Sequence, residues 1–272
     1  MPFAIARGLK LYYEERGSGP GLLFVGGTGG DLRQKPNIFD SPLAATFTVL
    51  AYDQRGLGRT DVPDGPYTMA GYAEDANALL DAVGWESCHI VGASFGGMVA
   101  QELAIRFPGR VQRLVLACTS SGDAGGASYP LHELAGLDVR ERVKQVVLLS
   151  DTRRDTEWMS THSSEFEALI QQALARATVG EPDRESGWRW QLEARRRHDT
   201  HDLLQSLSMP VYICGGKFDG IAPVDNSKAL ARQIPGACLE FFEGGHLFLR
   251  EDPRAFPRII AFLRGELPEE NK

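Results

Sequence analysis

The sequence lacks any long hydrophobic run. No stretch of its 272 residues approaches the ~18 consecutive apolar residues that a membrane-spanning helix needs. Its first ten residues also lack the longer apolar core of a secretory signal peptide. These absences predict a soluble, cytoplasmic protein without a membrane partner.

Cysteine is scarce, and no two cysteines form a Cys-x-x-Cys pair. The spacing therefore gives no sign of a disulfide framework or of a zinc site built on paired cysteines. Each cysteine lies in or beside a short apolar run, which predicts buried free thiols in a reducing compartment. The chain has 4 of them: Cys88, Cys118, Cys214 and Cys238.

Positive charge is in deficit. The chain has 29 Lys and Arg against 36 Asp and Glu, a formal net charge of −7. Such a surface repels phosphate backbones, so we expect no nucleic-acid partner. The hydrophobic share of 43% is ordinary for a globular protein, and the length suits one full domain with room for an insertion.

Short apolar runs alternate with helical patterns over much of the chain. This alternation predicts an α/β fold with a mostly parallel sheet and helices on both faces. Ligands bind such sheets beyond the carboxyl ends of the strands. The predicted strands are 22–25, 48–52, 88–91, 113–118, 211–214 and 237–242, and the predicted core helices are 72–83, 98–107 and 253–264.

The alternation is interrupted by a polar, helical stretch far longer than an ordinary loop. We expect residues 128–205, here called the inserted segment, to form a helical cap over the sheet edge. Residues 1–127 and 206–272 would then form the core domain. Three aromatic side chains of the cap could line a pocket, although each is more readily explained by packing of the cap: Trp158, Trp188 and Trp190.

The motif Gly92-x-Ser94-x-Gly96 follows one predicted strand and opens a helix. A strand-to-helix turn this tight strains its central residue and crowds the positions on either side, where glycine relieves the clash. Ser94 would project from the carboxyl edge of the sheet, near the positive end of the helix dipole. We interpret it as a nucleophile.

A serine nucleophile needs a base, and the base needs an acid to orient it. His246 follows the last predicted strand, and Asp219 follows the strand before it, so both belong to the same sheet edge. Asp123, which follows an earlier strand, is the alternative acid. The pair His198 and His201 resembles a metal-binding motif, but a helix start explains this stretch better, and we expect no metal.

The first predicted core strand runs into a glycine-rich loop at residues 26–30. No Gly-Lys-Ser/Thr follows, so the loop is not a P-loop, and it does not fit the dinucleotide pattern cleanly. We expect no cofactor. Glycines at this edge would let a backbone N–H approach a substrate oxygen closely.

Together these segments resemble the α/β-hydrolase superfamily over essentially the whole chain. The order Ser94, Asp219, His246 is the order of that family. The stretch 53–60, Asp-Gln-Arg-Gly-Leu-Gly-Arg-Thr, resembles its Asp-x-Arg-Gly-x-Gly-x-Ser turn. Within the superfamily the chain is similar to small capped esterases, enol-lactonases and cofactor-free haloperoxidase-like hydrolases.

The resemblance implies that the backbone N–H groups of Thr28 and Phe95 form an oxyanion hole. The family usually has His-Gly before the first of these residues, whereas this chain has Gly26-Gly27. Loss of that histidine is expected to loosen the support of the loop that carries Thr28. A serine at position 94 also departs from the dehalogenase and epoxide-hydrolase branches, which the resemblance implies would need an aspartate there.

We therefore expect a cofactor-free serine hydrolase of a small ester or lactone. Two alternatives stay open: a hydrolase of a C–C bond in a diketone-like substrate, and a ligand-binding protein with poor turnover. The sequence predicts neither the acyl group of the substrate nor the oligomeric state, and a homo-oligomer is compatible with it.

Overall fold

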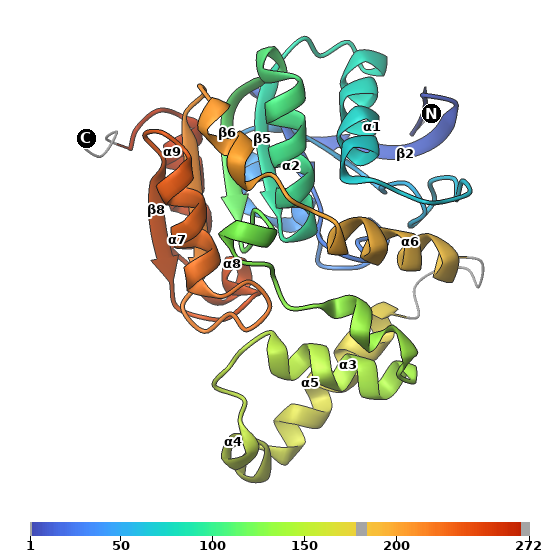
Figure 1. Ribbon diagram of the computed structural model, residues 1–272, viewed down its shortest axis with the longest axis vertical. Helices are drawn as coiled ribbons and strands as arrows, with labels where there is room; N and C mark the ends of the chain where they lie inside the picture. Colours follow the sequence, from blue (N-terminus) through green and yellow to red (C-terminus); the bar gives the residue numbers. More distant parts are fainter. Residues whose placement is uncertain (1, 178–183, 268–272) are drawn as a thin grey trace.

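The computed structural model describes residues 2–177 and 184–267. In this part of the chain, 8 strands form one sheet in the order β1-β2-β4-β3-β5-β6-β7-β8 (Figure 1). Strands β1, β2 and β4 are antiparallel to one another in succession, and all other neighbours are parallel. The predicted, mostly parallel sheet is confirmed.

The elements have the following bounds. The strands are β1 (Phe3–Ala6), β2 (Leu9–Arg16), β3 (Gly21–Val25), β4 (Thr48–Tyr52), β5 (Cys88–Ala93), β6 (Val111–Ala117), β7 (Val211–Gly216) and β8 (Cys238–Phe242). The α-helices are α1 (Met69–Ala82), α2 (Phe95–Arg106), α3 (Val139–Leu149), α4 (Thr156–Thr161), α5 (Ser163–Ala177), α6 (Arg184–Arg196), α7 (Val224–Gln233), α8 (Phe248–Glu251) and α9 (Ala255–Leu263).

Neighbouring apolar residues of each central strand face opposite sides of the sheet, because side chains alternate along a strand. In β3, Leu23 belongs to the core cluster that includes residues of α1 and α2, whereas Leu22 belongs to the cluster on the other face, which includes Ile259 of α9. Continuous apolar strands are therefore buried on both sides, as the sequence pattern predicted. Three cysteines are buried, but Cys238 is only half-buried, so the prediction of four buried thiols was wrong for that one.

The parallel strands all end at the same edge of the sheet. The loops after β3, β5, β7 and β8 therefore meet there, and they contain the residues that the sequence analysis selected. No helix of the described residues is long and apolar enough to cross a membrane.

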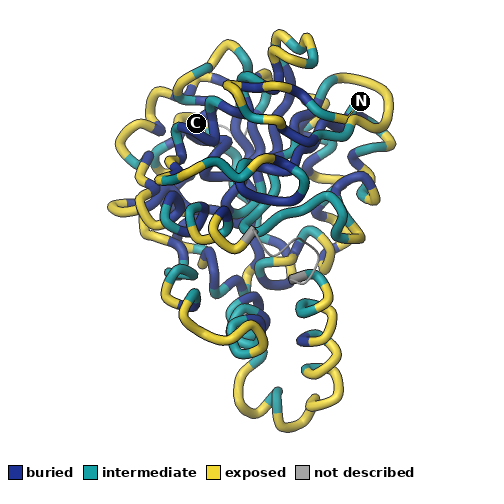
Figure 2. The backbone as a smooth tube through the Cα atoms, turned by 90° about the vertical axis from the view of Figure 1, so that its right-hand side faces the viewer, coloured by how far each residue is buried: buried dark blue, intermediate teal, exposed yellow. Residues whose placement is uncertain are grey.

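Helices α3 to α6 all come between β6 and β7, within the inserted segment. Figure 1 shows α3, α4 and α5 grouped below the sheet, with α6 lying between this group and the core. The same group is largely exposed in Figure 2, in contrast to the buried sheet above it. A small cluster of Val143, Val147 and Ile170 packs α3 against α5.

Candidate active site

Ser94 lies on the tight turn between β5 and α2. Its φ of 55° is in the left-handed region, which is strained for serine. A Cβ at Gly92 would lie 2.4 Å from the Gly96 carbonyl oxygen, and a Cβ at Gly96 would lie 2.0 Å from the Val25 carbonyl oxygen. Glycine is therefore required on both sides, and the turn presents Ser94 at the carboxyl edge of the sheet.

His246 lies on the loop after β8, between Ser94 and Asp219. Its Nε2 is 2.9 Å from Ser94 Oγ, and its Nδ1 is 2.7 Å from Asp219 Oδ2. The carboxylate of Asp219 is buried, and its Oδ1 accepts hydrogen bonds from the backbone N–H groups of Ile221 and Ala222, both at 2.8 Å. The structure thus joins the three side chains selected from the sequence into one hydrogen-bonded chain.

The C-terminal end of α3 contacts the loops after β7 and β8. The Gly220 N–H donates to the Leu149 carbonyl at 3.0 Å, and the His246 N–H donates to the Ser150 carbonyl at 2.6 Å. A Cβ at Gly245 would lie 1.9 Å from that Ser150 oxygen. The last carbonyls of a helix have no intrahelical partner, and here two loops of the site supply their donors.

The glycine-rich loop after β3 runs beside Ser94. A Cβ added to Gly27 would lie 3.5 Å from Ser94 Cβ. Phe95 opens α2, where the first N–H groups have no intrahelical acceptor. Within the described residues, neither Thr28 nor Phe95 donates its backbone N–H to a protein acceptor. Both groups are therefore free to donate to another oxygen.

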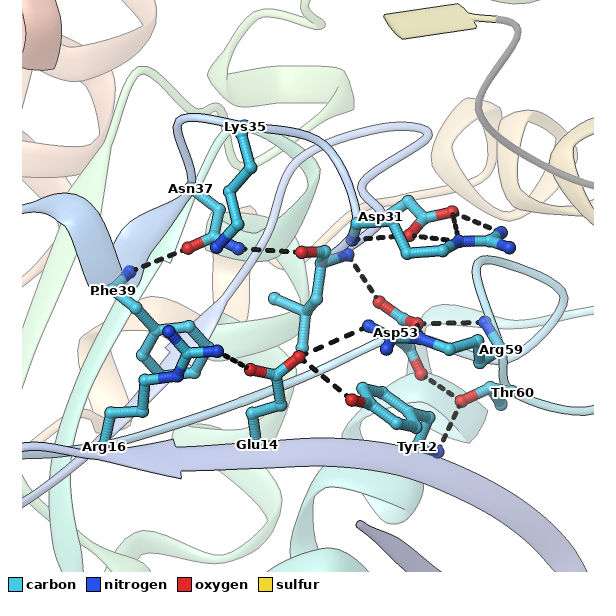
Figure 3. Close-up of polar contacts among 12 residues, drawn as sticks. Tyr12, Glu14, Arg16, Asp31, Lys35, Asn37, Phe39, Asp53, Arg59 and Thr60 are labelled. Carbon is cyan, nitrogen blue, oxygen red and sulfur yellow. Dashed lines mark hydrogen bonds and ion pairs between the residues drawn. The ribbon is translucent and has the colours of Figure 1, made fainter.

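The core supports both ends of this loop. Gln54 Nε2 donates to the Gly26 carbonyl at 2.9 Å, and the Leu32 N–H donates to Asp53 Oδ1 at 2.7 Å. Figure 3 shows the Asp53 carboxylate between the loop and the turn that carries Arg59, whose N–H donates to Asp53 Oδ2 at 2.9 Å. Burial raises the pKa of Asp53, and these backbone donors compensate part of the cost of burying the carboxylate.

The inserted segment supports the middle of the same loop. Gln191 of α6 is fully buried, and its Oε1 accepts a hydrogen bond from the Gly29 N–H at 2.8 Å. Trp188, one turn earlier, lies with its ring 3.7 Å from the position of a Cβ at Gly29. The sequence analysis missed Gln191, because a single glutamine in a helix carries no local signal of this contact.

The other sequence candidates lie outside this hydrogen-bonded chain. Asp123 is exposed in the short helix after β6, and the described contacts of His246 go to Asp219 instead. His201 contacts Ser121 and Gln233. His198 is buried, and burial lowers its pKa to about 4. Among the described residues, no group of three His, Cys, Asp or Glu side chains is placed to hold a metal ion.

A family model for the α/β hydrolase fold matches residues 20–253, which is most of the chain. The chain belongs to the α/β-hydrolase family. Its eight-stranded sheet and the strand-turn-helix around Ser94 are consistent with this membership.

Three known proteins illustrate the similarity. The poly(3-hydroxyalkanoate) depolymerase of Ectopseudomonas oleovorans is 29% identical over 254 residues, 90% of this chain and 84% of that protein. The 3-oxoadipate enol-lactonase 2 of Acinetobacter baylyi is 28% identical over 214 residues, 79% and 77% of the two chains. The crystal structure of the enol-lactonase from Burkholderia xenovorans LB400 shares the fold, with a TM-score of 0.78, 22% identity, and coverage of 97% of this chain and 100% of that chain. Family and relatives support a hydrolase role.

This α/β-hydrolase departs from the expected pattern where Gly26-Gly27 replaces His-Gly. Loss of the histidine removes one possible support of the loop. Two glutamine side chains contact the loop, Gln54 from the core and Gln191 from α6. The loop is thus bonded on both sides without the histidine.

Proposed function

We propose that this chain is a cofactor-free serine hydrolase that cleaves a small carboxylic ester or lactone. The observation that carries the proposal is the continuous hydrogen-bonded chain from Ser94 through His246 to the buried Asp219. This is the geometry of a nucleophile, its base and the acid that orients the base.

In the first half of the reaction, Ser94 Oγ attacks the substrate carbonyl carbon while His246 Nε2 takes the Oγ proton. The backbone N–H groups of Thr28 and Phe95 donate to the oxygen that gains negative charge. The tetrahedral intermediate then breaks its bond to the leaving oxygen, and His246 returns the proton to that oxygen. The products of this half are an alcohol and an acyl group on Ser94.

In the second half, water attacks the acyl carbon while His246 Nε2 takes one of its protons. The new intermediate breaks its bond to Ser94 Oγ, which regains a proton from His246. A carboxylic acid leaves and the site returns to its starting state. Throughout the reaction, Asp219 accepts a hydrogen bond from the Nδ1–H group of His246 and stabilises the imidazolium when it forms.

We further propose that the inserted segment, residues 128–205, acts as the cap that selects the substrate. Its support is the position of α6 and the end of α3, which contact the loops around Ser94 and His246. Residues 1–127 and 206–272 then supply the fold and the reacting groups, and substrate choice depends on the residues of the cap.

The direct test is a substrate panel on the full chain and on Ser94→Ala. The panel contains p-nitrophenyl esters of increasing acyl length, aliphatic lactones and a vinylogous 1,5-diketone. We expect turnover of an ester or a lactone that disappears in Ser94→Ala. Turnover of the diketone alone would make the chain a C–C hydrolase, and thermal stabilisation by ligands without turnover would make it a binding protein.

Trp188→Ala is expected to change the ranking of acyl chain lengths. Of the three tryptophans in the cap, Trp188 is the one that packs on the glycine-rich loop, against Gly29. Removing its ring enlarges the space beside the acyl group, so longer chains should gain in kcat/KM relative to acetate. The measurement is kcat/KM across the p-nitrophenyl ester series.

Trp158→Ala and Trp190→Ala are the matched controls. Trp158 stacks on His162 with ring centroids 5.0 Å apart, and Trp190 packs near Tyr67 at 6.4 Å. Both should keep the parent ranking, and all three variants should still react with a small phosphonate. An unchanged ranking in Trp188→Ala would show that other residues select the acyl group.

A further inference from the structure

We propose that Gln191 is a positioning residue for the glycine-rich loop of residues 26–30, so that the inserted segment completes the catalytic site as well as covering it. The inference rests on the proposed function, because it assigns a role to a loop whose Thr28 N–H is proposed to bind the oxyanion. The geometry that points to it is the hydrogen bond from the Gly29 N–H of that loop to Gln191 Oε1 of α6.

Core side chains bond this loop at its start and just beyond its end. Gln54 binds Gly26, and Asp53 binds Leu32. Gly29 lies between these points, in a turn in which the Gly30 N–H donates to the Gly27 carbonyl at 3.2 Å, and its φ of 69° is in the left-handed region that glycine adopts readily. The bond to Gln191 fixes the N–H of the peptide that directly follows Thr28. Without it, the part of the loop that carries the proposed donor loses its support from α6.

Helix α6 itself is tightly docked, so that the amide of Gln191 is held in place. A Cβ at Gly187 would lie 2.1 Å from the Gly56 carbonyl oxygen, which shows how closely the helix approaches the core. Trp190 packs against Gly65 on the same side, where an added Cβ would lie 2.2 Å from its ring. Positioning of this kind requires a rigid neighbour, and close backbone packing provides it.

The energetics of Gln191 favour a functional role over a stabilising one. The residue is fully buried, and within the described residues its Nε2 has no hydrogen-bond partner. A buried donor without an acceptor destabilises the folded state, so a position under selection for stability alone would favour an apolar side chain. Gln191→Met, which has a similar shape, removes this unpaired donor but also the acceptor of the Gly29 N–H, and because these two effects oppose each other we expect its Tm to lie near that of the parent.

The test compares Gln191→Met with the parent on the best ester of the panel. We expect kcat to fall about 10- to 100-fold, no more than the fall caused by removing one oxyanion donor. KM should stay within about twofold of the parent value. Affinity for a trifluoromethyl ketone, which Ser94 converts to a tetrahedral oxyanion, should fall by the same factor as kcat/KM. Affinity for the product carboxylate should stay the same, and Tm should lie near that of the parent.

Two variants separate positioning from general loosening of the cap. Leu192→Ala removes a buried side chain next to Gln191 and leaves the bond to Gly29, so it should lower Tm and keep kcat within about twofold. Gln145→Met makes the matched substitution on α3, where the amide binds only Glu141 in the described residues. This variant should change neither kcat nor Tm.

Two results would overturn the role of Gln191 alone. One is a Gln191→Met variant whose kcat equals that of the parent. The other is a loss of kcat in Gln191→Met that Leu192→Ala reproduces together with a lower Tm. Ester turnover that persists in Ser94→Ala would instead overturn the proposed function and the role of Gln191 with it. The two failures are therefore distinguishable.

Discussion

Replacing Ser94 with alanine is expected to lower kcat for an activated ester by about 10⁶-fold, the scale on which a nucleophile and base that act as a unit fail. The reason is that Ser94 Oγ is the atom that forms the acyl bond in the proposed mechanism. The variant should also lose all covalent labelling by a fluorophosphonate, measured by intact-protein mass spectrometry. Its Tm should stay near that of the parent, because the glycines on either side already relieve the turn.

Ser87→Ala is the matched control. Ser87 directly precedes the first residue of β5, at the end of the strand away from Ser94, and its side chain contacts Gln112. This variant should keep both turnover and labelling. If the label still attached to Ser94→Ala, the nucleophile would be another residue and the proposed mechanism would be wrong.

Asp219→Asn is expected to keep the fold and lower kcat by up to about 10⁴-fold. The asparagine oxygen can still accept the N–H groups of Ile221 and Ala222. An amide nitrogen facing His246, however, favours a proton on Nε2, and that tautomer cannot take the proton of Ser94. The measurement is kcat at a pH where the parent is fully active, beside circular dichroism as a check on folding.

Asp123→Asn serves as the control for the acid, because Asp123 is exposed and was the alternative candidate in the sequence. It should change kcat by less than about twofold. The opposite pattern, with a large loss in Asp123→Asn and little in Asp219→Asn, would move the acid to the loop after β6.

The residues around Ser94 could be predicted because their constraints are local. A strand, two glycines and a helix start are neighbours in the sequence, and the crowding between Gly92 and Gly96 occurs within five residues. Asp219 and His246 could be placed because parallel strands end at one edge. In each case, the pattern of one short segment was enough to locate the side chain.

Other features had no such local signal. Strands β1 and β2 form an antiparallel edge: β1 has only four residues, and β2 contains four charged residues, so neither has the long continuous apolar pattern of the central strands. The contact between Gln191 and Gly29 joins residues 162 positions apart. It depends on how α6 docks, which in turn depends on the close approach of Gly187 to Gly56. Such contacts follow from the tertiary structure alone.

The inserted segment reaches the site through backbone and amide contacts from two of its helices. The end of α3 accepts hydrogen bonds from Gly220 and His246, and α6 accepts one from Gly29. A chimera that received this segment from another family member would therefore exchange these supports of the loops around Ser94 and His246. Under the proposed function, substrate choice and rate would then change together, and an engineer who wishes to vary the first must transplant or rebuild these contacts.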